Sequence, residues 1–151
     1  MKKYIGVKEI EAKPLNLGDY NKYRGWQIPA NEDPARDGYL VKYPDGYESW
    51  SPKEVFDEAY RSSDEFPLVR TALGMTSPDY KERFKAEFYQ LKIRYDKLNA
   101  MVEKWDKGEL DFTPTCPRET YDKQLAAMVD YLSVLELRAN MEGVELLEEG
   151  E

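Results

Sequence analysis

The sequence predicts an α+β protein: a small N-terminal antiparallel β-sheet module with a short helix, followed by a long C-terminal antiparallel α-helical hairpin. Apolar and aromatic residues alternate with polar ones on both sides of a Pro-Asp-Gly turn at residues 44–46, which is typical of a β-hairpin. Large apolar residues then recur every three or four positions over residues 80–105 and again over 121–135, which is typical of amphipathic helices. Turn-forming residues at 108–117 separate these two stretches.

These patterns divide the chain into four segments. We expect a β-rich module at residues 1–61, a joint at 62–77, the helical hairpin at 78–142 and an acidic tail at 143–151. The joint is expected because its residues lose periodicity and include a proline and a glycine. The acidic tail is expected to fray.

The N-terminal module begins with residues 3–15, whose alternation predicts a strand that Pro14 ends. Asn16 is the expected N-cap of a short helix that follows. Residues 38–50 give the clearest strand pattern and predict a β-hairpin with aromatic cross-strand pairs. Ser51 begins a Ser-Pro-Lys-Glu run, which predicts Ser51 as the N-cap of a second short helix with Glu54 completing a capping box.

The helical hairpin is expected to start at Ser77 and Pro78, which repeat the pattern of a cap followed by proline. Its first helix carries one apolar stripe, formed by Tyr80, Phe84, Phe88, Leu91, Tyr95, Leu98, Met101 and Trp105. Its second helix carries a matching stripe, formed by Tyr121, Leu125, Met128, Leu132 and Leu135. Gly108 is expected to end the first helix, and Pro117 to open the second. Two stripes of this kind predict helices that pack against each other.

The charge of the chain excludes some partners. A formal net charge of −8 at pH 7 argues against nonspecific binding to DNA, RNA or an anionic membrane surface, since that binding needs a basic face. A small anionic ligand remains compatible, because a few aimed cations can hold it. Apolar runs are too short to span a bilayer, and the first residues lack the apolar segment of a signal peptide, so we expect a cytoplasmic location.

The inventory of reactive side chains is poor. The sequence has no histidine and one cysteine, which excludes disulfides, zinc sites built from histidine or several thiolates, and nucleophiles activated by histidine. The helical carboxylates have lysine or arginine three or four positions away, as on a solvated helix face. Cys116 is expected to be a small buried residue. We therefore expect no catalytic residue, no metal, no cofactor and no enzymatic activity.

One short stretch around the hairpin loop has the residue types of a binding site. Flat rings, cations and a hydroxyl lie next to a helix N-terminus, and one further arginine lies on the returning helix. Rings that sandwich bases and cations that hold phosphate are what a nucleotide pocket requires. The bland alternative is that the arginine on the returning helix pairs with an acid such as Glu87. The candidate residues are Trp105, Lys107, Phe112, Thr113, Arg118 and Arg138.

Longer strings of the sequence resemble phage proteins. The run KYIGVKEIEAKPLNLGDYNKYRGWQIPANEDPARDGYLVKYPDGYESWSPKEVFDEAY looks like a module common in small proteins of tailed phages. The runs YKERFKAEF, LKIRYDKLNAMVEKW and QLAAMVDYLSVLELR are similar to the hairpin of two kinds of phage anti-defence sponge. These are the first-described Thoeris anti-defence family, whose order of modules this chain resembles, and the cyclic-nucleotide sponge that counters CBASS. The resemblance covers about residues 3–141.

The resemblance implies sequestration without chemistry. Such sponges bind cyclic ADP-ribose isomers, and some also bind cyclic di- or trinucleotides, in the host cytoplasm. They form homo-oligomers, with a hexamer as one arrangement, and hold the ligand between subunits. Apolar residues outside the main stripes fit such assembly: these are Ile93, Val102, Val134 and Leu137.

The family's pattern also implies roles for individual residues. Its stacking ring corresponds to either Trp105 or Phe112, its basic position after that ring to Lys107, and its helix-ending arginine to Arg138. Two rival functions remain: a phage structural or protein-interaction module with no small-molecule ligand, and a nucleotide-cleaving enzyme.

Overall fold

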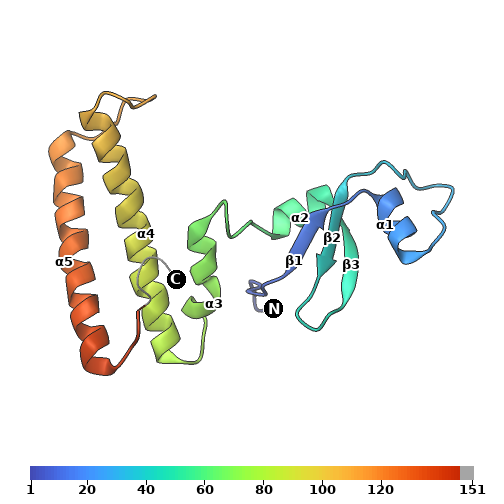
Figure 1. Cartoon of the computed structure of the whole chain (residues 1–151), viewed down its shortest axis with the longest axis horizontal. Coiled ribbons are helices and arrows are strands. Elements are labelled where there is room, and N and C mark those ends of the chain that lie inside the picture. The colour runs from blue at the N-terminus through green and yellow to red at the C-terminus, as the bar shows by residue number, and fades with distance from the viewer. Residues whose placement is uncertain (147–151) are drawn as a thin grey trace. The chain divides into compact units, whose positions relative to one another are not determined.

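The computed structural model describes residues 1–146, which fall into two compact units, Met1–Phe66 and Pro67–Glu151. The predicted α+β class is confirmed (Figure 1), because the first unit contains a three-stranded antiparallel sheet and the second contains a pair of long packed helices. Each unit has its own core and is described separately.

The sheet of the first unit has the order β1-β2-β3, with β1 at Glu11–Pro14, β2 at Gly38–Lys42 and β3 at Glu48–Pro52. Val41 lies on the central strand opposite Ala12 and Ser49 and is only 1% exposed. The predicted hairpin is confirmed: the amide of Tyr43 donates to the carbonyl of Tyr47 over 2.8 Å, beside the 44–46 turn.

The strand predicted over residues 3–15 is correct only for Glu11–Pro14. Residues 1–10 form no strand, and nearly all of them are exposed. Tyr4 and Ile5 illustrate this, with exposed fractions of 87% and 92%. The alternation in this segment therefore does not reflect a buried face.

Helix α1, Leu17–Arg24, begins as predicted, because the side chain of Asn16 accepts a hydrogen bond from the amide of Asp19 over 2.8 Å. The chain then reaches β2 through an irregular segment. The indole of Trp50 on β3 donates to the carbonyl of Leu15 over 2.8 Å, which ties the entry to α1 to the sheet.

Helix α2, Lys53–Ala59, follows β3 directly. The predicted capping box is wrong, because Pro52 occupies the N-cap position and the Ser51 hydroxyl bonds to the carbonyl of Pro52 instead. Because Ser51 pairs with Tyr39 in the sheet, it belongs to β3 and does not cap α2. Phe56 of α2 stacks on Tyr39 with ring centroids 4.1 Å apart.

The second unit is built on α4, Tyr80–Asp106, and α5, Arg118–Glu142, which form the predicted antiparallel hairpin. Helix α4 starts two residues later than expected, because Asp79 caps it by accepting from the amide of Lys81 over 2.9 Å. The hairpin's main buried cluster lies away from the loop and consists of Phe84, Phe88, Leu135, Ala139 and Val144. In the described residues, no helix has both the length and the apolarity needed to cross a membrane.

A third layer covers part of α4. Residues 67–75, within the segment expected to be a joint, form the 3-10 helix η1 at Pro67–Thr71 and helix α3 at Ala72–Met75. Gly74 permits a close approach, since a side chain there would place its Cβ 3.0 Å from the Cβ of Ala86. Gln90 of α4 donates to the Thr71 hydroxyl over 2.9 Å, which fixes this layer on the helix.

The chain does not fray directly after α5. Gly143 adopts a left-handed conformation, with φ of 63°, and Val144 then returns to the hairpin core, where it is 6% exposed. The amide of Val144 also donates to the carbonyl of Ala139 over 2.9 Å. The expected fraying is therefore wrong for residues 143–146, and the remainder of the predicted acidic tail, residues 147–151, lies outside the described residues.

Candidate functional site

The loop end of the hairpin brings together two of the predicted site residues. Trp105, in the last turn of α4, meets Tyr121 edge to face at 5.8 Å, and the Arg118 guanidinium lies 6.0 Å from the centre of the Trp105 ring. Arg118 also makes two hydrogen bonds to Asp106, of 3.1 and 3.2 Å, and one to Asp122. The bonds to Asp106, and then the bond to Asp122, raise the pKa of Arg118 above its usual value. Two carboxylates thus share the charge of Arg118.

The other predicted residues at this end are open to solvent. Lys107 follows the last residue of α4, and Gly108, with φ of 70°, ends the helix as predicted. Phe112 is 54% exposed in the loop, and Thr113 is exposed beside it. Cys116 is exposed as well, so its expected burial is wrong. This loop presents a ring and a cation outward.

Arg138 lies at the opposite end of the hairpin. Its Nε donates to the Glu142 carboxylate over 3.0 Å, and its guanidinium lies 4.9 Å from the centre of the Phe84 ring. It therefore pairs with an acid, as the alternative reading required, although the acid is Glu142 rather than Glu87. From Phe84 to Trp105 the rise of α4 is about 30 Å, so one chain cannot place Arg138 and Trp105 on the same small ligand.

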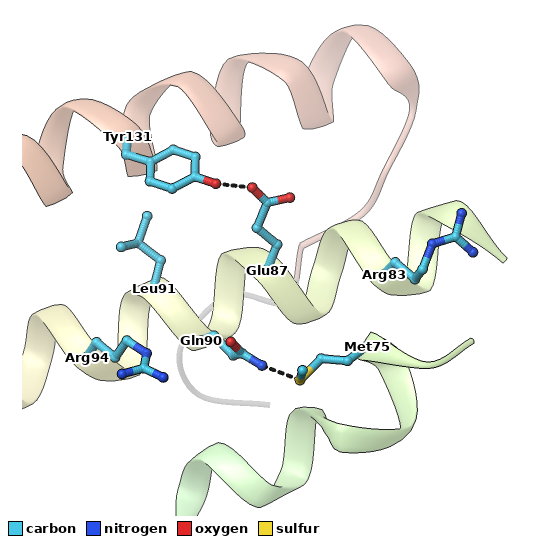
Figure 2. A pocket seen from close by; sticks show the side chains of 7 residues that line it. All are labelled: Met75, Arg83, Glu87, Gln90, Leu91, Arg94 and Tyr131. Carbon is cyan, nitrogen blue, oxygen red and sulfur yellow. Dashed lines mark hydrogen bonds between the residues drawn. The ribbon is translucent and has the colours of Figure 1, made fainter. Parts of the chain in front are cut away.

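A groove of about 400 Å³ runs along α4 in the second unit (Figure 2). Its floor is one stripe of the helix, while Met75 from α3 and Tyr131 from α5 line its two sides. The residues of that stripe are Arg83, Glu87, Gln90, Leu91 and Arg94. The volume lies within the range of small-molecule sites. We call this feature the α4 groove.

The two arginines of the α4 groove have no carboxylate partner. Arg83 donates to the backbone carbonyls of Ser77 and Pro78, over 2.7 and 2.9 Å. Arg94 forms no ion pair with any residue of the described chain. In the groove, two cations therefore face one carboxylate, that of Glu87.

Hydrogen bonds hold the polar side chains in the middle of the α4 groove. The Tyr131 hydroxyl donates to Glu87, and this bond raises the pKa of Tyr131. The Gln90 amide donates to Thr71 and to the sulfur of Met75 (Figure 2). Glu87 and Gln90 are thus held in place, and their side-chain oxygens can accept hydrogen bonds at the groove.

Sequence reasoning missed this groove for a physical reason. On a charged helix, Arg83, Glu87 and Arg94 read as a solvated face with acids and bases interspersed. The groove exists because Met75 of α3 closes one side of it, and the short, aperiodic sequence of this region predicts no helix. The available signal was the spacing of 83, 87, 90 and 94, which places all four residues on one face of a helix.

Comparison with known proteins identifies one segment. Residues 78–141 match the model of a protein family described as Sequestin. The match includes both long helices of the hairpin and covers less than half of the chain. No curated protein and no solved structure matches the chain significantly. The family's name denotes sequestration, which is consistent with the sponge-type anti-defence protein that the sequence resembles.

Proposed function

We propose that this protein is a phage anti-defence sponge, which binds a cyclic ADP-ribose-type or cyclic oligonucleotide immune signal without cleaving it. The observation that carries the proposal is the Sequestin match over α4 and α5. The acidic net charge of −8 supports a small ligand over nucleic acid, because nonspecific binding to nucleic acid needs a basic face. The absence of histidine supports binding without chemistry.

The proposed assembly is a homo-oligomer whose subunits share ligand pockets. Val134 and Leu137 on α5 are 53% and 54% exposed and offer an apolar surface to a second copy. Val102 does not contribute, since it is buried within the chain at 4% exposure. If two copies pack antiparallel, Arg138 of one copy approaches Trp105 and Phe112 of the other.

In such a shared pocket, the sequence-predicted residues keep the roles that the resemblance implies. The ring of Trp105 or Phe112 stacks on a base, and Lys107, Arg118 and Arg138 face the phosphates. Arg118 and Arg138 must then exchange carboxylates for phosphate. A sponge also needs tight binding, on the order of nanomolar or about −12 kcal/mol, because it has to hold its ligand below the effector's threshold.

The test of this function is ligand retention followed by release. The protein is incubated with cyclic ADP-ribose or a cyclic dinucleotide, freed of unbound ligand, and then heated. Recovery of intact ligand supports the sponge, whereas a linearised product would show an enzyme. If no ligand is retained from either class, the proposal is wrong and a protein-interaction role replaces it.

A further inference from the structure

We propose that the α4 groove is an anion-binding site, in which Arg83 and Arg94 hold the phosphates of a nucleotide within a single copy of the chain. The inference takes the nucleotide class from the proposed function. It differs in location, because no residue of the groove belongs to the loop end and no second copy is needed to complete it.

The ion pairs that the arginines form favour this groove over the loop end as a phosphate site. Arg118 and Arg138 each contact a carboxylate, and a ligand phosphate would have to displace it. Arg83 and Arg94 have no such competitor among the described residues. A guanidinium binds phosphate with two charge-assisted hydrogen bonds, and an arginine without an acid partner forms them at no cost in broken ion pairs.

The groove also carries groups that can contact the base of a nucleotide. The arginines lie at its two ends (Figure 2), with Cα atoms about 16 Å apart along the helix. The centre holds the Glu87 carboxylate and the Gln90 carbonyl, which accept hydrogen bonds from the exocyclic amino group of a base. Leu91 and Met75 supply apolar surface for its ring.

Several of these groups are held in place before any ligand arrives. Two backbone carbonyls fix Arg83, the Tyr131 hydroxyl fixes Glu87, and the Thr71 hydroxyl fixes Gln90. Fixed side chains lose little conformational entropy when a ligand binds. Arg94 is the exception, since no hydrogen bond holds its side chain within the described part of the chain.

The experiment is a calorimetric titration of the full chain with cyclic ADP-ribose and, separately, with ADP. Arg83→Ala and Arg94→Ala should each weaken binding about tenfold, the usual loss for a charge-assisted hydrogen bond. Arg94→Lys should restore part of the affinity. Lys97→Ala is the matched control, since it removes one positive charge from the exposed surface of the same helix outside the groove. Circular dichroism checks that every variant is folded.

The outcomes separate this inference from the proposed function. If wild type binds cyclic ADP-ribose and the two groove variants bind it equally well, the groove assignment is wrong and the sponge stands. If wild type binds ADP through these arginines but no cyclic nucleotide, the groove stands and the sponge fails. If neither probe binds at millimolar concentration, or if Lys97→Ala weakens binding as much as the groove variants, the groove assignment is overturned.

Discussion

Leu135 is the most deeply buried residue of the helical hairpin, with only 1% of its surface exposed. It lies in the same cluster as Phe84 and Phe88 from the facing helix. A side chain that is closed in from both helices leaves a cavity when it is shortened, because packed neighbours relax only partly.

Leu135→Ala should therefore lower the free energy of unfolding by about 2–5 kcal/mol. Val129→Ala, on the same helix but 42% exposed, is the control and should change it by less than about 0.5 kcal/mol. Urea unfolding followed by circular dichroism measures both. Equal losses in the two variants would show that the cluster does not hold the hairpin together.

Charged residues show the limit of sequence reasoning at this scale. The sequence places Arg118 beside the hairpin loop at a helix N-terminus and Arg138 on the returning helix near the apolar stripe, and both were predicted as ligand cations on those grounds. It cannot show that each faces a carboxylate across a turn or a loop, which depends on side-chain geometry. The capping role of Asn16 was predictable because its partner lies three residues away. The role of Ser51 was not, because its pairing with the neighbouring strand places it in the sheet.

At the scale of elements, a hydrogen bond between Tyr131 and Glu87 joins α5 to α4. This bond is the largest cause of the raised pKa of Tyr131, ahead of desolvation and the charge of Glu87. Because the folded-state pKa lies above the value in the unfolded chain, the bond stabilises the fold fully below about pH 10. Its contribution is then lost as the pH rises through the folded-state value.

In a spectrophotometric titration of the tyrosines, the phenol of Tyr131 should therefore ionise above the ordinary tyrosine range, and Tyr131→Phe should remove that ionisation step. Glu87→Gln should bring that phenol back toward the ordinary tyrosine range, since the carboxylate that holds the proton is gone. The helices themselves should persist in both variants. A titration curve that neither substitution alters would mean that the two helices are not joined here in solution.

Helices with long periodic stripes were predictable from the sequence, and α4 and α5 follow the expected bounds within two residues. The elements that were missed are short. The region of η1 and α3 contains Pro67 and Gly74 and has too few residues to show a period, so only its packing on α4 makes it helical. Missing them also meant missing a wall of the α4 groove.

At the scale of the whole molecule, the proposed shared pocket depends on the assembly of several copies of the chain. The exposed faces of Val134 and Leu137 lie one turn apart on α5, on the outside of the chain. Val134→Glu combined with Leu137→Glu should convert the proposed oligomer to single chains, because charges are costly to bury at an interface.

Light scattering coupled to size-exclusion chromatography measures that change. Ser133→Glu adds one of these two negative charges at an exposed polar position of α5 and should leave the assembly intact. If the double variant keeps the wild-type mass, α5 does not form the interface and the shared pocket has to be built from another surface.

The return of Val144 to the hairpin core bears on where this fold can be cut. The stretch shared with the Sequestin model stops at residue 141, and it begins at residue 78, after η1 and α3. A gene fragment trimmed to those limits would lose Val144, which packs in the core at one end of the helix pair. It would also lose η1 and α3, which pack along α4. Any attempt to graft or shuffle this helical unit between proteins should carry residues 67–146 as one piece.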